Sequence, residues 1–268
     1  MKIPFIDHHV HTNFSPDADP EATMKRYIDK AKRIGRSGMM FTDHVDMDTP
    51  VELFFEYPDY NQYKAKIDAL NEPAFFVGMG VEIGYLETIK AKLSEFIHSH
   101  PFDFVIASLH LGDGLDFYNN DFFIGKTQKE AYQRYFELML EMVENFRDYD
   151  VVGHLDYIIR YGNYNTKNYQ YSDYKALIDA ILKAIIKNNK GLEINTSGFR
   201  YGLGVTHPSV TLLKRYKALG GKIITLGSDA HKVADFEADF DHAVALLKKA
   251  GFSDIAVFKK RKPTFYKV

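Results

Sequence analysis

Short apolar segments and longer amphipathic segments alternate along almost the whole chain of 268 residues. The apolar segments have the length of strands, and the amphipathic segments repeat their apolar residues at the 3/4 spacing of helices. Strands are expected at residues 3–6, 38–42, 74–84, 102–110, 148–156, 191–198 and 222–231. Helices are expected at residues 19–34, 60–70, 86–97, 127–146, 172–188, 209–219 and 236–247, with a short closing strand at 255–258.

This alternation predicts an α/β protein with a mostly parallel sheet and right-handed crossovers. Seven or eight strand–helix units in a chain of this length favour a closed or nearly closed barrel of the TIM type. No linker or repeat interrupts them, which favours one domain over residues 1–268. An open doubly wound sheet is the alternative, and it is weakened because no glycine-rich phosphate-binding turn follows the first expected strand.

The composition excludes several classes of function. A formal net charge of −2 argues against a broad nucleic-acid-binding surface, which needs a strongly basic face. No cysteine is present, so a thiolate metal site and a cysteine nucleophile are excluded. No signal segment and no run of 18 apolar residues occur, so we expect a cytoplasmic protein without a membrane partner. The sequence leaves the oligomeric state open.

The run DHHVHTNFSPD at residues 7–17 directly follows the first expected strand. In an extended segment alternate side chains share a face, so His9 and His11 point together, with Asp7 on the same side. The turn after them contains proline and returns Asp17 to the end of the strand. Two imidazoles and carboxylates so placed can converge on a metal ion.

Side chains of the types that bind metals occupy the ends of nearly all the expected strands. In a parallel barrel these ends share one face, where such enzymes place their active sites. Zinc-like sites take three or four protein ligands, so a set of nine implies two or three ions with at least one bridging carboxylate. Imidazole and carboxylate ligands suit Zn, Fe or Mn. The candidate ligands are His9, His11, Asp17, His44, Glu82, His110, His154, Asp229 and His231.

Arginines and tyrosines in the loops of the same face suggest what the metals act on. Arg160 and Arg200 carry guanidinium forks, which match phosphate oxygens in bidentate geometry; solvated surface arginines are the alternative. The loops are rich in tyrosine, including Tyr118 and Tyr161, and such loops suit a small planar organic group. Packing between loops is the alternative for each tyrosine. A small phosphorylated substrate is therefore expected.

The motifs DHHVHTNFSPD, TDH, GVEIG, SLH, GHLD and SDAH, in this order from residue 7 to 231, resemble the PHP (polymerase and histidinol phosphatase) superfamily. The chain length and the aspartate at position 17 are most similar to its stand-alone histidinol-phosphate phosphatases. The resemblance implies a distorted (β/α)7 TIM-like barrel with a trinuclear metal site. It also implies three ligand groups: His9, His11, Glu82 and Asp229; Glu82, His110 and His154; and Asp17, His44 and His231.

The activity implied by this resemblance is metal-dependent hydrolysis of L-histidinol phosphate to L-histidinol and phosphate in histidine biosynthesis. Bound metals lower the pKa of water, so a hydroxide bridging two ions is the expected nucleophile. Asp229 and His231 are expected to be catalytic, with Asp229 orienting the nucleophile. His207 either contacts substrate, protonates the leaving group, or stabilises a turn. The acidic partner of the substrate ammonium stays open among Asp46, Asp48, Asp113 and Asp116.

Three other functions compete with this interpretation. Another phosphoesterase of the same fold would act on nucleotides or nucleic-acid 3′ ends, with bases stacked on the aromatic loops. An amidohydrolase-like metallohydrolase would attack a carbonyl, and the two loop arginines argue against it. A non-catalytic metal-binding module is the third, and the intact set of ligands argues against it.

Overall fold

The computed structural model describes residues 7–54 and 57–268. The strand expected at residues 3–6 lies outside the described residues. Seven strands form one sheet in the order β1-β3-β4-β7-β8-β9, with β2 paired to β3, and all their pairings are parallel. Their bounds are β1 Gly38–Phe41, β2 His44–Val45, β3 Phe76–Gly84, β4 Phe104–Ser108, β7 Val151–Val152, β8 Gly191–Asn195 and β9 Ile224–Gly227.

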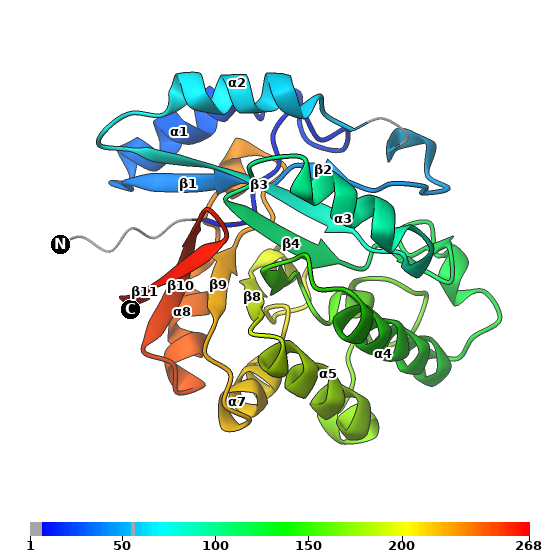
Figure 1. The fold of residues 1–268 in the computed structure, drawn as a ribbon. Coiled ribbons are helices and arrows are strands. Elements are labelled where there is room, and N and C mark those ends of the chain that lie inside the picture. Colours follow the sequence, from blue (N-terminus) through cyan, green and yellow to red (C-terminus); the bar gives the residue numbers. More distant parts are fainter. Residues whose placement is uncertain (1–6, 55–56) are drawn as a thin grey trace.

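Residues 7–11 lie between β9 and β1 and join the two edges of this sheet. On one side His8 N donates to Leu226 O (2.9 Å), and Val10 forms a parallel bridge with Ala230. On the other side Met40 N donates to Asp7 O (3.0 Å). The sheet thereby curls into a distorted (β/α)7 TIM-like barrel, as the sequence predicts (Figure 1). The open doubly wound sheet is excluded.

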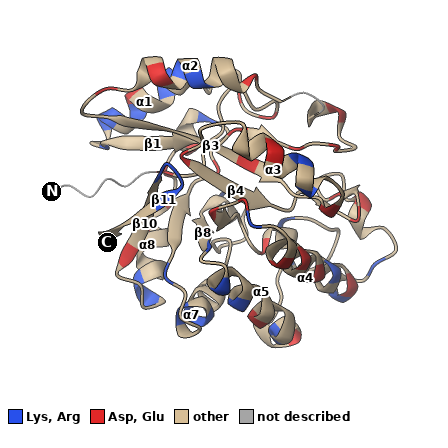
Figure 2. Ribbon diagram, in the orientation of Figure 1, with Lys and Arg blue, Asp and Glu red and all other residues tan. Residues whose placement is uncertain are grey.

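Helices cover the outside of the barrel (Figure 1). Figure 2 shows that charged residues of both signs lie along these helices. The capping box of Thr127 and Glu130 starts the longest helix, where the Thr127 side chain accepts from Glu130 N. The helix bounds are α1 Met24–Arg33, α2 Tyr60–Leu70, α3 Lys90–His98, α4 Gln128–Asn145, α5 Lys175–Lys187, α6 Ser197–Arg200, α7 Val210–Ala218 and α8 Phe240–Lys249.

The first helix starts later than the sequence suggests. Asp19 Oδ1 accepts from Glu21 N (2.8 Å) and so holds a turn rather than a helix. Thr23 is the N-cap, with its side chain accepting from Arg26 N. The expected start at residue 19 is therefore wrong by about one turn.

The chain ends in an antiparallel hairpin of β10 Asp254–Lys259 and β11 Lys262–Lys267, of which only the first strand was expected. Phe258 is buried among apolar side chains of the barrel strands: Met40, Phe104, Ile106 and Val151. The hairpin therefore fills the amino-terminal end of the barrel, opposite the strand ends that carry the candidate ligands. A second hairpin, β5 Leu111–Gly112 with β6 Leu115–Asp116, extends the loop after β4.

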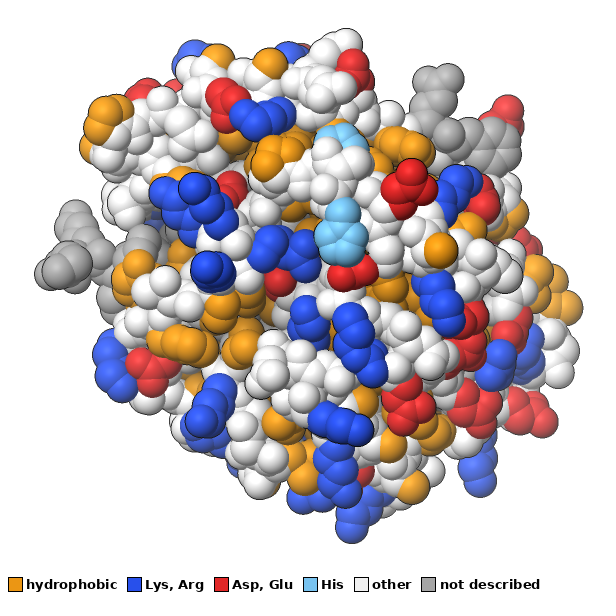
Figure 3. All heavy atoms as spheres, in the orientation of Figure 1, with side chains coloured by type: hydrophobic (Ala, Val, Ile, Leu, Met, Phe, Trp, Pro, Cys, Tyr) orange, Lys and Arg blue, Asp and Glu red, His pale blue; other side chains and the backbone are white. Residues whose placement is uncertain are grey.

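The tip of the β10–β11 hairpin is strongly basic and appears blue in Figure 2. On the face drawn in Figure 3, Lys and Arg side chains gather near the middle, and many of the Asp and Glu side chains lie to the right. Acidic groups anchor the tip, because Arg261 Nε donates to Asp150 and Lys260 N donates to Asp103 Oδ1 (2.9 Å). These contacts tie the hairpin to the start of β4 and to the segment before β7.

Candidate metal centre

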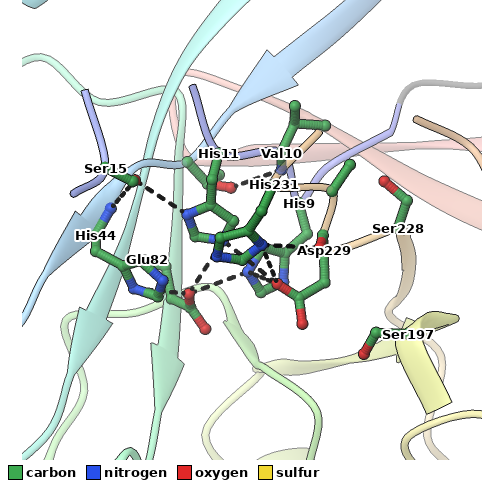
Figure 4. A network of polar contacts seen from close by, with 12 residues as sticks. His9, Val10, His11, Ser15, His44, Glu82, Ser197, Ser228, Asp229 and His231 are labelled. Atoms are coloured by element: carbon green, nitrogen blue, oxygen red, sulfur yellow. Dashed lines mark hydrogen bonds and ion pairs between the residues drawn. The ribbon is translucent and has the colours of Figure 1, made fainter. Parts of the chain in front are cut away.

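Glu82, on β3, lies at the middle of the candidate ligands and is 1% exposed. Its Oε2 lies 3.1 Å from His9 Nε2 and 3.4 Å from His11 Nε2, and both imidazoles come from the segment that closes the barrel. Asp229 faces the same two histidines from the end of β9, with Oδ1 3.7 and 3.5 Å from their Nε2 atoms. Figure 4 shows these side chains converging. The first ligand group of the resemblance is thus brought together.

The other oxygen of Glu82 faces a second pair of imidazoles. Glu82 Oε1 lies 2.9 Å from His154 Nε2 and 3.3 Å from His110 Nε2. Ser108, at the end of β4, donates its hydroxyl to the same oxygen (2.6 Å). One carboxylate therefore presents each oxygen to a different set of histidines, which is the geometry of a bridging ligand.

The third expected group lies next to the first. Asp17 Oδ2 is 3.0 Å from His231 Nε2 and 3.6 Å from His44 Nε2. The ring of His11 packs against those of His44 and His231, with both centroid separations 4.1 Å, and the centroids of His44 and His231 are 5.7 Å apart. His44 also reaches Glu82, since its Nδ1 lies 3.2 Å from Oε2. His44 therefore stands between two groups rather than belonging to one.

The residues present fit metal ions. Among the described residues, the buried Nε2 atoms of His9 and His11 have no hydrogen-bond partner although they face carboxylate oxygens. Sets of three side chains offer ligand atoms within 4.8 Å of one another, such as His9 with His11 and Asp229. Lone pairs that are buried, convergent and unpaired are what a cation satisfies.

The carboxylates of the cluster and His11 are held in the forms that bind metals. Burial opposes the charged forms of His9 and His110, but carboxylate neighbours outweigh it and raise the pKa of both, so these two imidazoles release a proton when a metal binds. Burial alone would raise the pKa of Glu82, but neighbouring imidazoles, chiefly His9 and His110, hold this pKa well below its ordinary value. Burial likewise opposes the ionised form of Asp229, whose pKa is nevertheless lowered by His9 and His11. Burial and the adjacent His231 lower the pKa of His11 well below its usual range. Ionised carboxylates and a neutral imidazole are the forms that bind metals.

A cavity of about 660 Å³ opens over these ligands. Arg160 and Arg200 both line it and both lie against Asp229: Arg160 Nη2 is 3.4 Å from Asp229 Oδ2, and Arg200 Nη2 donates to Asp229 O (2.8 Å). Tyr118 and Tyr161 line the cavity too, as expected for the aromatic loops. Seven of the predicted metal ligands, both arginines and both tyrosines therefore line one cavity, and His9 and His11 lie buried outside its lining.

A sequence model described as the PHP domain matches residues 7–197. The chain belongs to the PHP family. A histidinol-phosphatase of Lactococcus lactis subsp. lactis is 35% identical over 259 residues, which cover 96% of this chain and 95% of that protein. A probable histidinol-phosphatase of Clostridium acetobutylicum is 31% identical over 262 residues, which cover 96% of this chain and 97% of that protein. The family resemblance in the sequence is confirmed.

A solved structure shows the same PHP fold with its ligands. The crystal structure of histidinol phosphate phosphatase from Lactococcus lactis subsp. lactis, complexed with zinc, L-histidinol and phosphate, superposes with a TM-score of 0.89. The two chains are 34% identical, and the match covers 97% of this chain and 99% of that one. In the described part of this PHP chain, no helix is long and apolar enough to cross a membrane.

His207 is placed apart from the other expected residues of this PHP chain. It is fully buried, and its Nδ1 lies 2.8 Å from Asp156 Oδ1, which is also buried. His207 is not among the residues that line the cavity. Of the roles left open for it, this position favours stabilisation of the loop that contains Pro208.

Sequence reasoning missed a buried carboxylate beside the candidate metal ligands. Glu193 Oε1 lies 2.6 Å from His9 Nδ1, on the ring edge away from Glu82. Its strand, GLEIN, bears no candidate ligand at its end, so the pattern of ligands at strand ends gave no reason to select it. The available signal was an acidic residue inside an apolar strand, since buried carboxylates are rare unless they are paired.

Proposed function

We propose that this PHP protein hydrolyses L-histidinol phosphate to L-histidinol and phosphate, as a metal-dependent phosphatase of histidine biosynthesis. The observation that carries the proposal is one cavity lined by seven of the nine candidate metal ligands and by both arginines, with His9 and His11 buried against Glu82 and Asp229. The identity of the substrate is taken from the related histidinol-phosphatases named above. The proposal includes one domain over residues 1–268 and a cytoplasmic location, where a charged phosphate ester made in the cell stays available.

Within this proposal the three ligand groups hold two or three divalent ions (Zn, Fe or Mn), with Glu82 as the bridging carboxylate. When bound, such ions supply Lewis acidity toward phosphate oxygens and lower the pKa of water toward neutrality. Asp229 stands between the His9–His11 pair, which its Oδ1 faces, and Arg160, which donates to its Oδ2 (3.4 Å). In this proposal Oδ2 also orients the attacking water and accepts its proton. His231, 26% exposed at the cavity side, completes the group with Asp17.

Arg160 and Arg200 bind the phosphate in this proposal. Arg160 is held in place by aromatic rings, since its guanidinium carbon lies 4.1 Å from the centroid of Tyr201 and 4.6 Å from that of Tyr157. Its Nε and Arg200 Nη1 are buried without a hydrogen-bond partner among the described residues. Two buried donors next to Asp229 are free for phosphate oxygens, which accept charge-assisted hydrogen bonds.

The cavity also fits the organic part of the substrate. Asp48 pairs with Lys92 and Asp113 pairs with Arg134 outside the cavity, whereas Asp46 lines the cavity but is paired with the candidate ligand His110. Asp116 lines the cavity, and burial raises the pKa of its carboxyl. We therefore assign Asp116 to the substrate ammonium, whose charge would offset that burial. Tyr118 and Tyr161, with ring centroids 6.2 Å apart, are placed to contact the imidazole.

The test is phosphate release from the purified protein with four substrates: L-histidinol phosphate, p-nitrophenyl phosphate, a nucleoside monophosphate and a 3′-phosphorylated oligonucleotide. Each is measured before and after chelation, and again with Zn, Mn or Fe restored. We expect kcat/KM for L-histidinol phosphate to exceed the others by several orders of magnitude, to vanish on chelation and to return with metal. A preference for the nucleotide or the oligonucleotide would show that L-histidinol phosphate is not the substrate. Absence of phosphate release from all four compounds would overturn the proposal.

A further inference from the structure

β8 lies within the barrel sheet between β7 and β9, yet none of the nine candidate ligands belongs to it. It carries two polar side chains instead. Glu193 and Asn195 are 1% and 0% exposed and, two residues apart on a strand, share one face. Polar groups are costly to bury, so they require partners that the fold provides.

Glu193 contacts two of the candidate metal ligands. One oxygen, Oε1, contacts His9 Nδ1 at 2.6 Å, while Oε2 accepts from the backbone N of His154 (2.9 Å). A carboxylate at Nδ1 fixes that proton and turns Nε2, as a lone pair, toward the metal. Glu193 thus sets the tautomer of one candidate ligand and the backbone position of another.

Asn195 links Glu193, through Ser197, to Arg160. Its Nδ2 donates to Glu193 Oε2 (3.1 Å), and its Oδ1 accepts from Ser197 N (2.9 Å) and from the Ser197 hydroxyl. The Ser197 oxygen in turn accepts from Arg160 Nη2. Figure 4 places Ser197 on the segment beside Asp229. An unbroken series of hydrogen bonds therefore runs from His9 to Arg160.

The side chains at both ends of the series are closely packed. A β-carbon added at Gly227, on the neighbouring strand, would lie only 2.0 Å from Glu193 Oε1 and 2.6 Å from the β-carbon of His9. Glycine at this position lets the carboxylate lie flat against β9. At the other end Arg160 is stacked between Tyr157 and Tyr201.

We propose that Glu193, Asn195 and Ser197 are positioning residues that set the distance between the metal ions at His9 and the phosphate-binding guanidinium of Arg160. This inference rests on the proposed function in one respect: it takes from it that His9 binds metal and that Arg160 binds phosphate. In-line attack on phosphorus requires the metals and the guanidinium to hold their separation, and an error of about 1 Å can cost about a hundredfold in rate. β8 is therefore the element that aligns the two halves of the site.

The test measures the two ends separately. Zinc affinity is obtained by competition with a chromogenic chelator, and affinity for inorganic phosphate by titration calorimetry of the zinc-loaded protein. Glu193→Gln is expected to weaken zinc binding by about 10- to 100-fold and to leave phosphate affinity within about twofold. Ser197→Ala is expected to weaken phosphate binding by about tenfold and to leave zinc affinity unchanged. Asn195→Ala is expected to weaken both.

Thr225→Val is the matched control, because Thr225 pairs with Glu193 in the β8–β9 register and its buried hydroxyl has no hydrogen-bond partner among the described residues. It should change neither affinity. The inference is overturned if Glu193→Gln and Ser197→Ala lower the melting temperature alone, with both affinities as in the unaltered chain. Both readouts are binding constants, so they remain measurable if L-histidinol phosphate is not the substrate. An unaltered chain that binds no zinc would overturn the inference and the proposed function together.

Discussion

At the scale of single residues, the metal centre depends most on Glu82, whose two oxygens face different histidines. Glu82→Gln keeps the volume of the side chain but replaces one charged oxygen with an amide nitrogen. We expect it to lose at least one ion per chain and to lower kcat by about a hundredfold or more, because a bridging ligand serves two ions. The measurement is metal content by mass spectrometry together with phosphate release.

Glu87→Gln is the control for this substitution, since Glu87 pairs with Tyr85 and Lys90 outside the centre. It should retain both metal and activity. A Glu82→Gln protein with its full metal content would show that Glu82 bridges no ions.

The two cavity arginines give a second prediction at this scale. Arg160→Ala and Arg200→Ala are each expected to reduce kcat/KM by about a hundredfold or more, since each removes charge-assisted hydrogen bonds to phosphate. Arg160→Lys should restore little, because an ammonium replaces neither the fork nor the stacking on tyrosine rings. Arg134→Ala, which removes an exposed pair with Asp113, is the control. Activity unchanged in both cavity variants would exclude the phosphate role.

Most of the candidate ligands could be selected from the sequence because they lie at or just after the end of a recognisable strand, and parallel strands bring their ends together. Glu193 could not be selected this way, because its role depends on where the His9 ring lies across the barrel. The choice of Asp116 over Asp48 and Asp113 as the partner of the substrate ammonium also required the structure. Asp48 and Asp113 pair with Lys92 and Arg134, whereas Asp116 lines the cavity, and local sequence does not record this difference.

At the scale of elements, the β10–β11 hairpin shows where local pattern fails. Hairpin turns with positive φ normally use asparagine and glycine. Here Lys260 and Arg261 take φ values of 51° and 62°, stabilised by the contacts with Asp103 and Asp150. The turn is thus specified by tertiary contacts, and the sequence alone did not reveal β11.

The hairpin carries a prediction about stability. Phe258 is 2% exposed within the barrel, so Phe258→Ala should lower the free energy of unfolding by about 3–5 kcal/mol. Denaturant unfolding of the two proteins measures the difference. Phe265→Ala, on β11 and 47% exposed, should cost much less. Equal effects of the two substitutions would show that the hairpin does not fill the barrel.

The pairing of α5 with α7 should depend on pH. Asp179 on α5 accepts two hydrogen bonds from Arg215 on α7 (2.7 and 2.6 Å), and this arginine lowers the pKa of Asp179 to about 2. A lowered carboxyl pKa stabilises the fold above the unfolded value, near 4, and this contribution is lost as the pH falls toward 2. Asp179→Asn should therefore lower the melting temperature by a few degrees at pH 7 and by much less near pH 2.

The comparison of the two melting curves between pH 7 and pH 2 tests this expectation. Asp68→Asn, which removes an exposed pair with Lys64 within α2, serves as the control and should have little effect at any pH. A constant difference between Asp179→Asn and the unaltered chain at all pH values would exclude a contribution from the ionised pair.

At the scale of the whole molecule, the metal centre joins side chains from most of the barrel strands. Removal of metal should therefore destabilise the entire fold. Ions present at about 100 times their dissociation constant stabilise the native state by about 2.7 kcal/mol. For a chain of this size, chelation should lower the melting temperature by roughly 5 °C or more, and added zinc should restore it. An unchanged melting temperature would contradict binding at the centre.

The architecture was predictable because the strand–helix alternation admits few topologies. The way the barrel closes was less predictable. Residues 7–11 pair with β9 and β1 through backbone atoms, and no side-chain pattern in DHHVH specifies both neighbours. The short β7, only Val151–Val152, likewise differs from the longer strand expected at 148–156 because the chain turns away at Gly153.

The closure by residues 7–11 has a consequence for how the protein is made. Asp7 and Ser228, which contact each other there, are 221 positions apart in the sequence. On the ribosome, His9 and His11 emerge early, while Asp229 and His231 emerge only after most of the chain. Contacts of such long range form late in folding. A nascent chain therefore cannot assemble its full ligand set until synthesis is almost finished, so a prematurely terminated product would hold metal poorly and be inactive.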